Sequence, residues 1–194
     1  MSDPPRVILL DSNAYFRLAR TIHPLLAGTF GVNPVNSLYV LSDLDDEYST
    51  NPRLRTKFEW VREARYQRDR SAKRYAYGGK LRKQVENAFS FLVAYAREQA
   101  INLSREDLKA LAVGLARGIP VVGDDAGMGK VAEVHGIEYW GVLRLLHLMV
   151  SSDRIDMNMV KQLLQYLDQE NDPPMPRSKL RAEFNKCFGT ACPI

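Results

Sequence analysis

Acidic residues form separate groups along this chain, and their placement is the first sign of chemistry in the sequence. Asp11 follows a short apolar run, a second group occupies residues 43–47, Asp107 stands near the start of a helical pattern, and residues 124–125 form a pair. Carboxylates that are forced together raise one another's pKa unless a positive charge lies between them. Oxygen ligands of this kind select Mg²⁺ or Mn²⁺ rather than zinc, and such an ion polarises a phosphate and activates water.

The elements that must position these acids alternate between strand and helix. Short apolar runs predict four strands, at residues 7–10, 38–41, 119–122 and 137–140. Strands that alternate with helices indicate an α/β fold, with a central, mostly parallel sheet between two helical layers. Helical patterns are expected at residues 14–26, from 43, 54–77, 81–99, 108–116, 130–134, 142–150, 159–167 and 179–188.

The acids lie where such a fold would gather them. In parallel sheets the functional site lies at the carboxyl ends of the strands. Asp11, residues 43–47 and residues 124–125 each follow a predicted strand, and Asp107 begins the helix that leads into the third strand. We therefore expect these carboxylates to converge at one edge of the sheet.

Each acid also has a purely structural interpretation. Asp11 could serve a turn or a helix cap, and Asp107 could be a capping partner of Ser104. Residues 124–125 could form a plain turn, and the acids of residues 43–47 could face a helix dipole. The conjunction of all four groups favours the metal site over the separate structural explanations.

Two sequence motifs resemble those of a known family. The segment from Val7 to Asn13, an apolar strand followed by Asp-Ser-Asn, resembles the opening motif of PIN domains. Residues 103–125 resemble the second half of these domains, with an Asp on a helix, an Ala-rich turn, a Gly, a strand and a final Asp. The resemblance covers roughly residues 5–140. It implies a metal-dependent ribonuclease or, as in the flap-endonuclease relatives, a structure-specific DNase, and many small bacterial members are toxins of toxin–antitoxin pairs.

The resemblance also implies roles for individual residues. Asp11, Asp107 and Asp125 match the first, third and fourth carboxylates of the family's catalytic, metal-binding set. Asp124 is expected as an auxiliary metal ligand, and Asn13 is expected to steady the set by hydrogen bonding.

The second family carboxylate has two candidates. Glu47 resembles it most closely, and Asp43 competes for the same role. The chain departs from the family at Gly123, where Thr or Ser is common. The missing hydroxyl leaves open how the loop after the third strand is held.

Residues 52–83 form a strongly basic segment, with twelve Lys and Arg residues against three acids and with aromatic residues interspersed. Basic side chains neutralise phosphates, and aromatic rings stack on unpaired bases. Residues 68–79 are expected to form a mobile loop or arch, while a solvated helix face with core aromatics remains the alternative. The expected nucleic-acid contacts are Arg65, Arg68, Arg70, Lys73, Arg74 and Lys80.

Composition sets the remaining expectations. The chain has 194 residues, 45% of them hydrophobic, which suits a core that needs no disulfide. Cys187 and Cys192 are expected to be free thiols, and no apolar stretch is long enough to span a membrane, so we expect a cytoplasmic protein. We divide the chain into a PIN-like nuclease domain at residues 1–141, with residues 52–83 as its basic insertion, and a helical C-terminal extension at residues 142–194 that packs on it.

These observations together predict a Mg²⁺- or Mn²⁺-dependent endonuclease, with RNA favoured over DNA as the substrate. A structure-specific DNase and a catalytically weak binding module of the same fold are the alternatives. A phosphoacceptor domain of the receiver type is a weaker one, because no lysine-bearing strand end follows the acidic turn. An antitoxin and a second copy of the chain are the protein partners considered.

Overall fold

The computed structural model describes residues 3–194, which contain one four-stranded sheet in which all the strands are parallel. The strand order is β2-β1-β3-β4, so β1 is a central strand, with β2 on one side and β3 on the other. The strands are β1 (Arg6–Leu10), β2 (Asn36–Val40), β3 (Val121–Val122) and β4 (Tyr139–Trp140). The predicted α/β fold with a central parallel sheet is confirmed.

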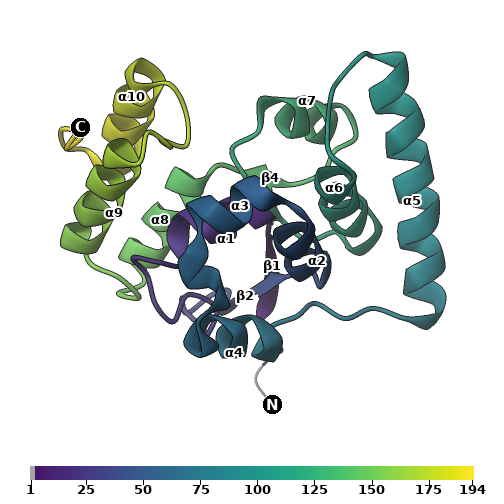
Figure 1. Cartoon of the computed structure of the whole chain (residues 1–194), viewed down its shortest axis with the longest axis horizontal. Coiled ribbons are helices and arrows are strands. Elements are labelled where there is room, and N and C mark those ends of the chain that lie inside the picture. The colour runs from purple at the N-terminus through teal and green to yellow at the C-terminus, as the bar shows by residue number, and fades with distance from the viewer. Residues whose placement is uncertain (1–2) are drawn as a thin grey trace.

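Helices cover both faces of this sheet (Figure 1). They follow the expected order along the chain, with some changed boundaries. The continuous helix expected at residues 54–77 is wrong, because two α-helices and a 3-10 helix occupy residues 52–72 and residues 73–77 are not helical. The helices are α1 (Ser12–Leu18), α2 (Asp43–Thr50), α3 (Pro52–Lys57), the 3-10 helix η1 (Glu59–Arg62), α4 (Ala64–Ala72), α5 (Gly79–Glu98), α6 (Arg105–Arg117), α7 (Ala126–Val134), α8 (Val142–Ser151), α9 (Met157–Gln169) and α10 (Arg177–Phe188).

Side-chain alternation along the strands explains the layers. Successive strand residues point to opposite faces of a sheet. Ile8 and Leu10 belong to the hydrophobic cluster that contains α1 and α8–α10, whereas Leu9 belongs to the cluster of α5–α7. Figure 1 accordingly shows α5 at one end of the molecule and α9 and α10 at the other. Residues of the C-terminal helices therefore share one core with the N-terminal strands.

Helix α1 ends earlier than the sequence pattern predicts, at Leu18 rather than near residue 26. The chain turns after it, and the backbone N–H groups of Leu25 and Leu26 both donate to the carboxylate of Asp69, at 3.1 Å each. Asp69 is buried, so these bonds replace the helical hydrogen bonds that residues 25 and 26 would otherwise make. A contact between distant segments thus overrides the local helical pattern.

The loop or arch considered for residues 68–79 is in part a helix and in part a segment paired with the sheet edge. Helix α4 continues to Ala72, and the chain then runs along the edge of β2. Val40 donates its N–H to the carbonyl oxygen of Lys73 at 3.1 Å, and Tyr75 donates to the carbonyl oxygen of Val40 at 2.8 Å. These ladder bonds fix the segment because they satisfy the free edge of a central-sheet strand.

Three aromatic residues of the basic segment lie in the core rather than on a binding surface. Phe58, Trp60 and Tyr66 are at most 8% exposed and pack in the same cluster as α1. The alternative of core aromatics is therefore correct for these three. Both cysteines are free, as expected. Within residues 3–194, no helix is long and apolar enough to cross a bilayer.

Helix α6 is defined at both ends by local signals and is pressed against the sheet. Ser104 and Asp107 form a capping box at its start, and Gly118 ends it with a φ of +65°. At Gly114 an added Cβ would lie 2.6 Å from Cγ2 of Val121 and 3.1 Å from Cγ2 of Ile137. The absence of a side chain at this position lets the helix approach β3.

We predict that Gly114→Ala lowers the free energy of unfolding by about 1–3 kcal/mol, because the new methyl overpacks the contact with Val121. This loss opposes the gain of about 1 kcal/mol that Ala brings to a helix. Gly129→Ala on α7 is the matched control, since its Cβ would meet only Tyr139, at 3.7 Å. Urea unfolding measures both variants, and a Gly114→Ala protein as stable as the control would contradict the close packing.

Candidate metal centre

Three carboxylates from distant parts of the chain lie near enough to one another, at the carboxyl end of the central strand, to raise the pKa of two of them. Asp11 follows β1, Glu47 lies on α2 and Asp107 lies in the first turn of α6. Asp11 is only 4% exposed, and its pKa rises from 3.8 to about 8. Burial is the largest cause, followed by the charges of Asp107 and Glu47, against the opposing effect of the backbone N–H groups after it. We call these three residues the carboxylate cluster.

Glu47 has the same kind of environment. Burial raises its pKa, and the charges of Glu106 and Asp107 raise it further, while the hydroxyl of Ser12 lowers it. Its Oε2 atom is buried and has no hydrogen-bond partner in the part of the chain that the structure describes. A buried oxygen without a donor costs free energy unless a ligand satisfies it.

Asp107 both caps helix α6 and belongs to the carboxylate cluster. Its carboxylate accepts a hydrogen bond from the N–H of Ser104 at 2.9 Å, and its own N–H donates to the Ser104 hydroxyl at 3.0 Å. The same carboxylate is near enough to Asp11 and Glu47 to raise both pKa values. The capping box therefore fixes the acid in place without removing it from the cluster.

Glu106 is an acid near the cluster that the sequence analysis missed. The negative charge of Glu106 raises the pKa of Glu47 more than the negative charge of Asp107 does. The signal was present, because Glu106 is adjacent to Asp107 in the first turn of the helix. The capping motif indicates a role only for Asp107.

Both candidates on α2 are near Asp11: the charge of Glu47 raises the pKa of Asp11, and Asp43 lines a small pocket with Asp11 while it pairs with a base. Lys109 on α6 donates to the Asp43 carboxylate. The cause is helical geometry, because residues four apart share one face but lie a turn apart. Glu47 and Asp43 therefore lie one turn apart near the end of β1, and within residues 3–194 Asp43 alone of the two has a lysine partner.

The donor set of the carboxylate cluster suits a hard divalent cation. Among residues 3–194, none of its three members forms an ion pair with Lys, Arg or His, and the nearby Lys109 is engaged by Asp43. Carboxylate oxygens are the ligands that Mg²⁺ and Mn²⁺ prefer. In these residues no three His, Cys, Asp or Glu side chains already stand in metal-binding geometry. A shared ion would therefore have to draw the acids together against their mutual repulsion.

Asp124 has a structural position that the sequence analysis did not anticipate. Its Oδ1 accepts the N–H of Val142 at 3.0 Å, and its Oδ2 lies 3.5 Å from the guanidinium of Arg17. Burial raises its pKa to about 6, although the Val142 and Arg17 contacts lower it. Arg17 also binds Asp172, at 3.1 Å. Asp124, which follows β3, thus uses one oxygen to bind α8 and the other to bind α1. The sequence predicted a metal ligand at this position instead.

Asp125 lies farther out and begins α7. It is exposed, and its Oδ1 accepts the N–H of Met128 at 2.8 Å, so the turn-and-cap interpretation applies to it. The hydroxyl of Tyr139 donates to the carbonyl oxygen of Asp125 at 3.3 Å. Burial and then the charges of Asp11, Asp124 and Asp125 raise the pKa of that hydroxyl. Tyr139 therefore stands among the three acids.

Tyr139 also explains Gly123. An added Cβ on Gly123 would lie 2.7 Å from the Tyr139 hydroxyl and 3.5 Å from Cβ of Asp11. The tyrosine fills the space beside the glycine, and the Gly123 N–H donates to the carbonyl oxygen of Trp140 at 3.0 Å. The loop is thus held from β4 rather than by a hydroxyl on residue 123. Asn13 is exposed, and its effect on Asp11 comes from its backbone N–H.

Arg70 needs a correction. It was expected to contact nucleic acid, but it is only 4% exposed. Its guanidinium binds Asp45 at 2.8 Å and donates twice to the carbonyl oxygen of Val61 at 3.2 Å. It also lies over the ring of Tyr15, whose pKa is raised to about 12, chiefly by burial. An arginine with its donors used inside the protein holds α2, η1 and α4 together.

The other expected basic contacts divide into engaged and exposed residues. Lys73 donates to the Ser37 hydroxyl at 2.8 Å, Arg74 binds Asp45 at 2.5 Å, and Arg65 pairs with Glu63 at 2.9 Å. The remaining two are exposed at the surface: Arg68 and Lys80.

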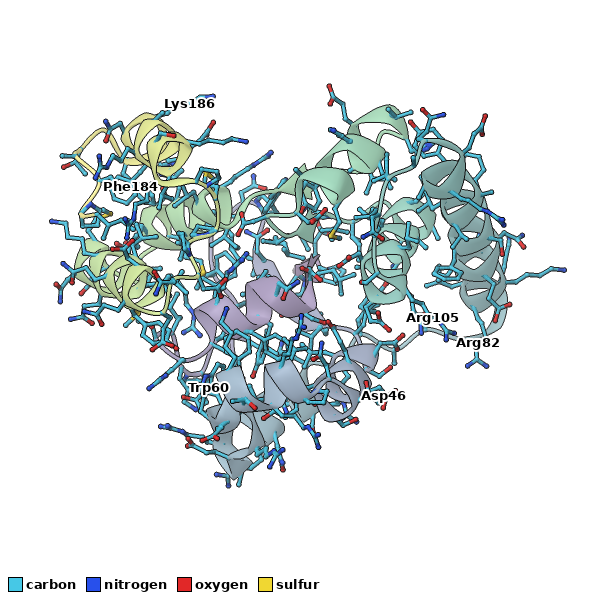
Figure 2. The ribbon with its side chains drawn as sticks, turned by 45° about the horizontal axis from the view of Figure 1, so that its top comes forward. Asp46, Trp60, Arg82, Arg105, Phe184 and Lys186 are labelled. Atoms are coloured by element: carbon cyan, nitrogen blue, oxygen red, sulfur yellow. The ribbon has the colours of Figure 1, made fainter. Side chains whose placement is uncertain are left out.

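A surface with basic and aromatic side chains adjoins the carboxylate cluster. A pocket of about 410 Å³ lies between the segment after α4 and helices α5 and α6, and we call it the aromatic pocket. Glu86 is the acid on its wall. Figure 2 shows Arg82 and Arg105 side by side at this place. Its aromatic and basic walls are formed by Tyr75, Tyr77, Phe89, Arg82, Arg105 and Lys109.

Comparison with known proteins adds little to this geometry. No family model matches the chain, and no curated protein matches its sequence. Among solved structures, the chain is similar to the crystal structure of FitAcB from Neisseria gonorrhoeae, at 12% sequence identity and a TM-score of 0.45. The similarity covers 70% of this chain and 97% of that chain. The resemblance to PIN domains therefore stays a prediction from the two sequence motifs.

The raised pKa of Asp11 predicts how stability depends on pH. Because the folded-state pKa of about 8 exceeds the ordinary 3.8, the folded protein holds this proton more tightly than the unfolded chain between these values. The contribution of Asp11 to stability is therefore fully present below pH 4 and is lost as the pH rises to 8. Without divalent cations, Asp11→Asn should raise the free energy of unfolding at pH 8 and change it little at pH 4.

Chemical unfolding at both pH values in EDTA tests this dependence. Asp46→Asn, an exposed acid beside Glu47 whose outward position Figure 2 shows, is the matched control and should keep the wild-type profile. An Asp11→Asn protein that is less stable than wild type at pH 8 would mean that the buried carboxyl is not under strain.

The contact between Gly123 and Tyr139 predicts an energetic coupling. Gly123→Ala should lower the free energy of unfolding by about 1–3 kcal/mol, because its methyl meets the tyrosine hydroxyl. In a Tyr139→Phe background the nearest ring atom, Cζ, would be 3.4 Å away, so the loss should be smaller. A double-mutant cycle measures the difference, and purely additive effects would show that the hydroxyl does not occupy this space.

Proposed function

We propose that this protein is a metal-dependent endonuclease that hydrolyses phosphodiester bonds of single-stranded nucleic acid, with RNA as the favoured substrate. The observation that carries the proposal is the carboxylate cluster at the carboxyl end of β1. Its members have no basic partner among the described residues, whereas Asp43, Asp45 and Asp124 each form an ion pair with Lys or Arg. Uncompensated negative charge in a buried place is costly, and a bound cation offsets it.

Asp11, Glu47 and Asp107 would hold Mg²⁺ or Mn²⁺. When bound, the cation supplies charge neutralisation for the scissile phosphate and activation of the attacking water. Asp11 must release the proton that burial keeps on its carboxyl below about pH 8, so cation binding should strengthen as the pH rises. Glu106 adds negative charge beside Glu47, and a direct role of Asp125 stays a prediction.

The aromatic pocket is the proposed path of the strand into the site. The partly exposed rings of Tyr75 and Tyr77 can stack on bases that are not paired, which favours a single strand over a duplex. Arg105 precedes Glu106 directly on α6, so a phosphate beside this arginine would lie near the acids. Lys109 joins the two regions, because it lines the pocket and binds Asp43.

Two features of the proposal come from the family resemblance alone. RNA is favoured over DNA on that ground, and a DNase acting on single strands or flaps is the alternative. An antitoxin partner and a homodimer likewise stay predictions.

The central test is cleavage of labelled single-stranded RNA and DNA in the presence of Mn²⁺, Mg²⁺ or EDTA. Asp11→Asn, Glu47→Gln and Asp107→Asn should each lower the rate at least about 100-fold, as the loss of one preorganised electrostatic contact does. Asn at position 107 can still accept the Ser104 N–H, so the helix cap is preserved. Asp46→Asn should cleave like wild type.

Thermal unfolding supplies a readout that does not depend on cleavage. Mn²⁺ should raise the melting temperature of the wild type and of Asp46→Asn, because a ligand that binds only the folded state stabilises it by about 2.7 kcal/mol at 100 times its Kd. It should leave Asp11→Asn unchanged. If Mn²⁺ stabilises the protein but neither RNA nor DNA is cleaved, a binding module is favoured. If Mn²⁺ neither stabilises the protein nor supports cleavage, the metal centre is refuted.

A further inference from the structure

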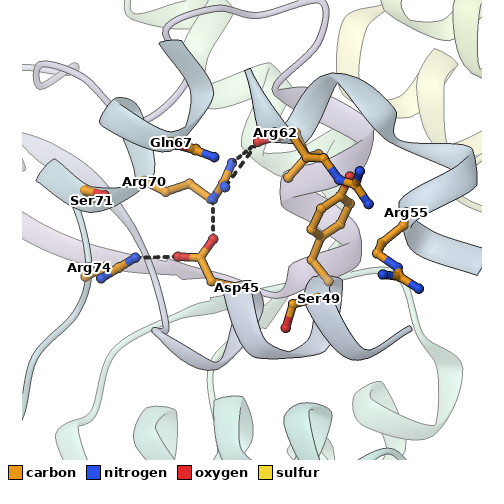
Figure 3. Close-up of a pocket in the computed structure, with 10 residues that line it drawn as sticks. Asp45, Ser49, Arg55, Arg62, Gln67, Arg70, Ser71 and Arg74 are labelled. Atoms are coloured by element: carbon orange, nitrogen blue, oxygen red, sulfur yellow. Dashed lines mark hydrogen bonds and ion pairs between the residues drawn. The ribbon is translucent and has the colours of Figure 1, made fainter. Parts of the chain in front are cut away.

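A second polar pocket lies on the opposite side of α2 from the carboxylate cluster. It has a volume of about 420 Å³ and is walled by α2, α3, η1, α4 and the segment after α4 (Figure 3). Helical residues turn by about 100° each, so Asp45 points almost directly away from Glu47, two positions later. Asp45 lines this pocket, whereas Glu47 faces Asp11. The two sites therefore use opposite faces of one helix.

Positive charge dominates the walls of this pocket. Four arginines line it against one acid, Asp45, and we call it the arginine pocket: Arg55, Arg62, Arg70 and Arg74. Asp45 binds the buried Arg70 at 2.8 Å and Arg74 at 2.5 Å, so one carboxylate is shared between two guanidinium groups. Figure 3 shows both interactions on the same side of the pocket.

The two arginines on the other side are not neutralised. In Figure 3 the side chains of Arg55 and Arg62 lie across the pocket from Asp45 and Arg74. Neither forms an ion pair within residues 3–194, although Glu59 lines an adjoining pocket with both of them. The Nε atom of Arg55 is buried and has no hydrogen-bond partner among these described residues. A buried donor on a charged group is costly to leave unsatisfied, so this side of the pocket favours a ligand that carries hydrogen-bond acceptors.

The ligand that best suits these arginines is a compact anion with more than one negative charge. Guanidinium groups donate in pairs to phosphate and carboxylate oxygens, and phosphate matches their fork geometry with more oxygens. Neutral donors are also available, because Ser49, Gln67 and Ser71 line the same walls. The volume exceeds a phosphate alone and falls within the roughly 300–1,000 Å³ of small-molecule pockets, so a terminal nucleotide can enter with its phosphate.

We propose that the arginine pocket binds the terminal phosphate of a nucleic-acid strand, away from the site of cleavage. A concave pocket favours an end over the middle of a strand, because a continuing backbone needs an open groove at both sides. This assignment rests on the proposed function in one respect, the choice of a nucleic acid as the carrier of the phosphate. Helix α2 would then link the end of the strand to the carboxylate cluster.

The test compares binding of one fluorescent single-stranded oligonucleotide with a 5′-phosphate, a 3′-phosphate or hydroxyls at both ends, all in EDTA. Wild type should bind one phosphorylated form at least about tenfold more tightly than the hydroxyl form, the change expected from one charge-assisted hydrogen bond. The double variant Arg55→Gln/Arg62→Gln should lose this preference. Arg53→Gln/Arg97→Gln removes the same charge from exposed positions outside the pocket and should keep it.

Further arms separate the explanations. If the double variant does not fold, Arg62→Gln alone serves, because this side chain is exposed. Inorganic phosphate and a nucleoside monophosphate are added as competitors, and displacement by the monophosphate at equal affinity would make the ligand a free nucleotide and overturn the strand assignment. Equal binding of all three oligonucleotides, or a preference that survives in the double variant, would overturn the pocket itself. Binding in EDTA is measured without metal-dependent cleavage. A phosphate preference in a protein that cleaves neither RNA nor DNA with Mn²⁺ or Mg²⁺ would therefore refute the proposed function and leave the phosphate site standing.

Discussion

The burial of the Asp11 carboxyl at the end of the central strand is the constraint on which the rest of the site depends. β1 lies between two other strands and has hydrophobic clusters on both faces, so the residue that follows it cannot reach bulk water. The helices that cover this end of the sheet bring Glu47 and Asp107 to it. The result is a set of acids in a place of low solvation, where burial disfavours the ionised form and a bound cation would favour it.

Three other acids on the elements around this site have basic partners. Asp43 binds Lys109, Asp45 is shared by two arginines, and Asp124 accepts Val142 and faces Arg17. Two arginines of the basic segment, Arg70 and Arg74, thus neutralise an acid of the protein itself. The three members of the carboxylate cluster and the adjacent Glu106 form no such pair among the described residues, so their charge is left for a cation to balance.

Helix α2 connects the two places where charge is not balanced. One of its faces carries Glu47 toward the carboxylate cluster, and the opposite face carries Asp45 into the arginine pocket. An excess of negative charge and an excess of positive charge thus lie on either side of a single eight-residue helix. A rigid element between a cation site and a phosphate site would keep a bound strand at a fixed distance from the acids.

The sequence by itself determined the order of strands and helices, the position of Asp11 after β1 and the capping box that fixes Asp107. These follow from local patterns, because side-chain period, apolar runs and caps act over a few residues. Only the tertiary structure decided that Asp43 pairs with Lys109, that Arg70 is buried, and that Tyr139 fills the space at Gly123. Each of these depends on contacts between segments far apart in the chain, where burial and charge pairing outweigh local preference.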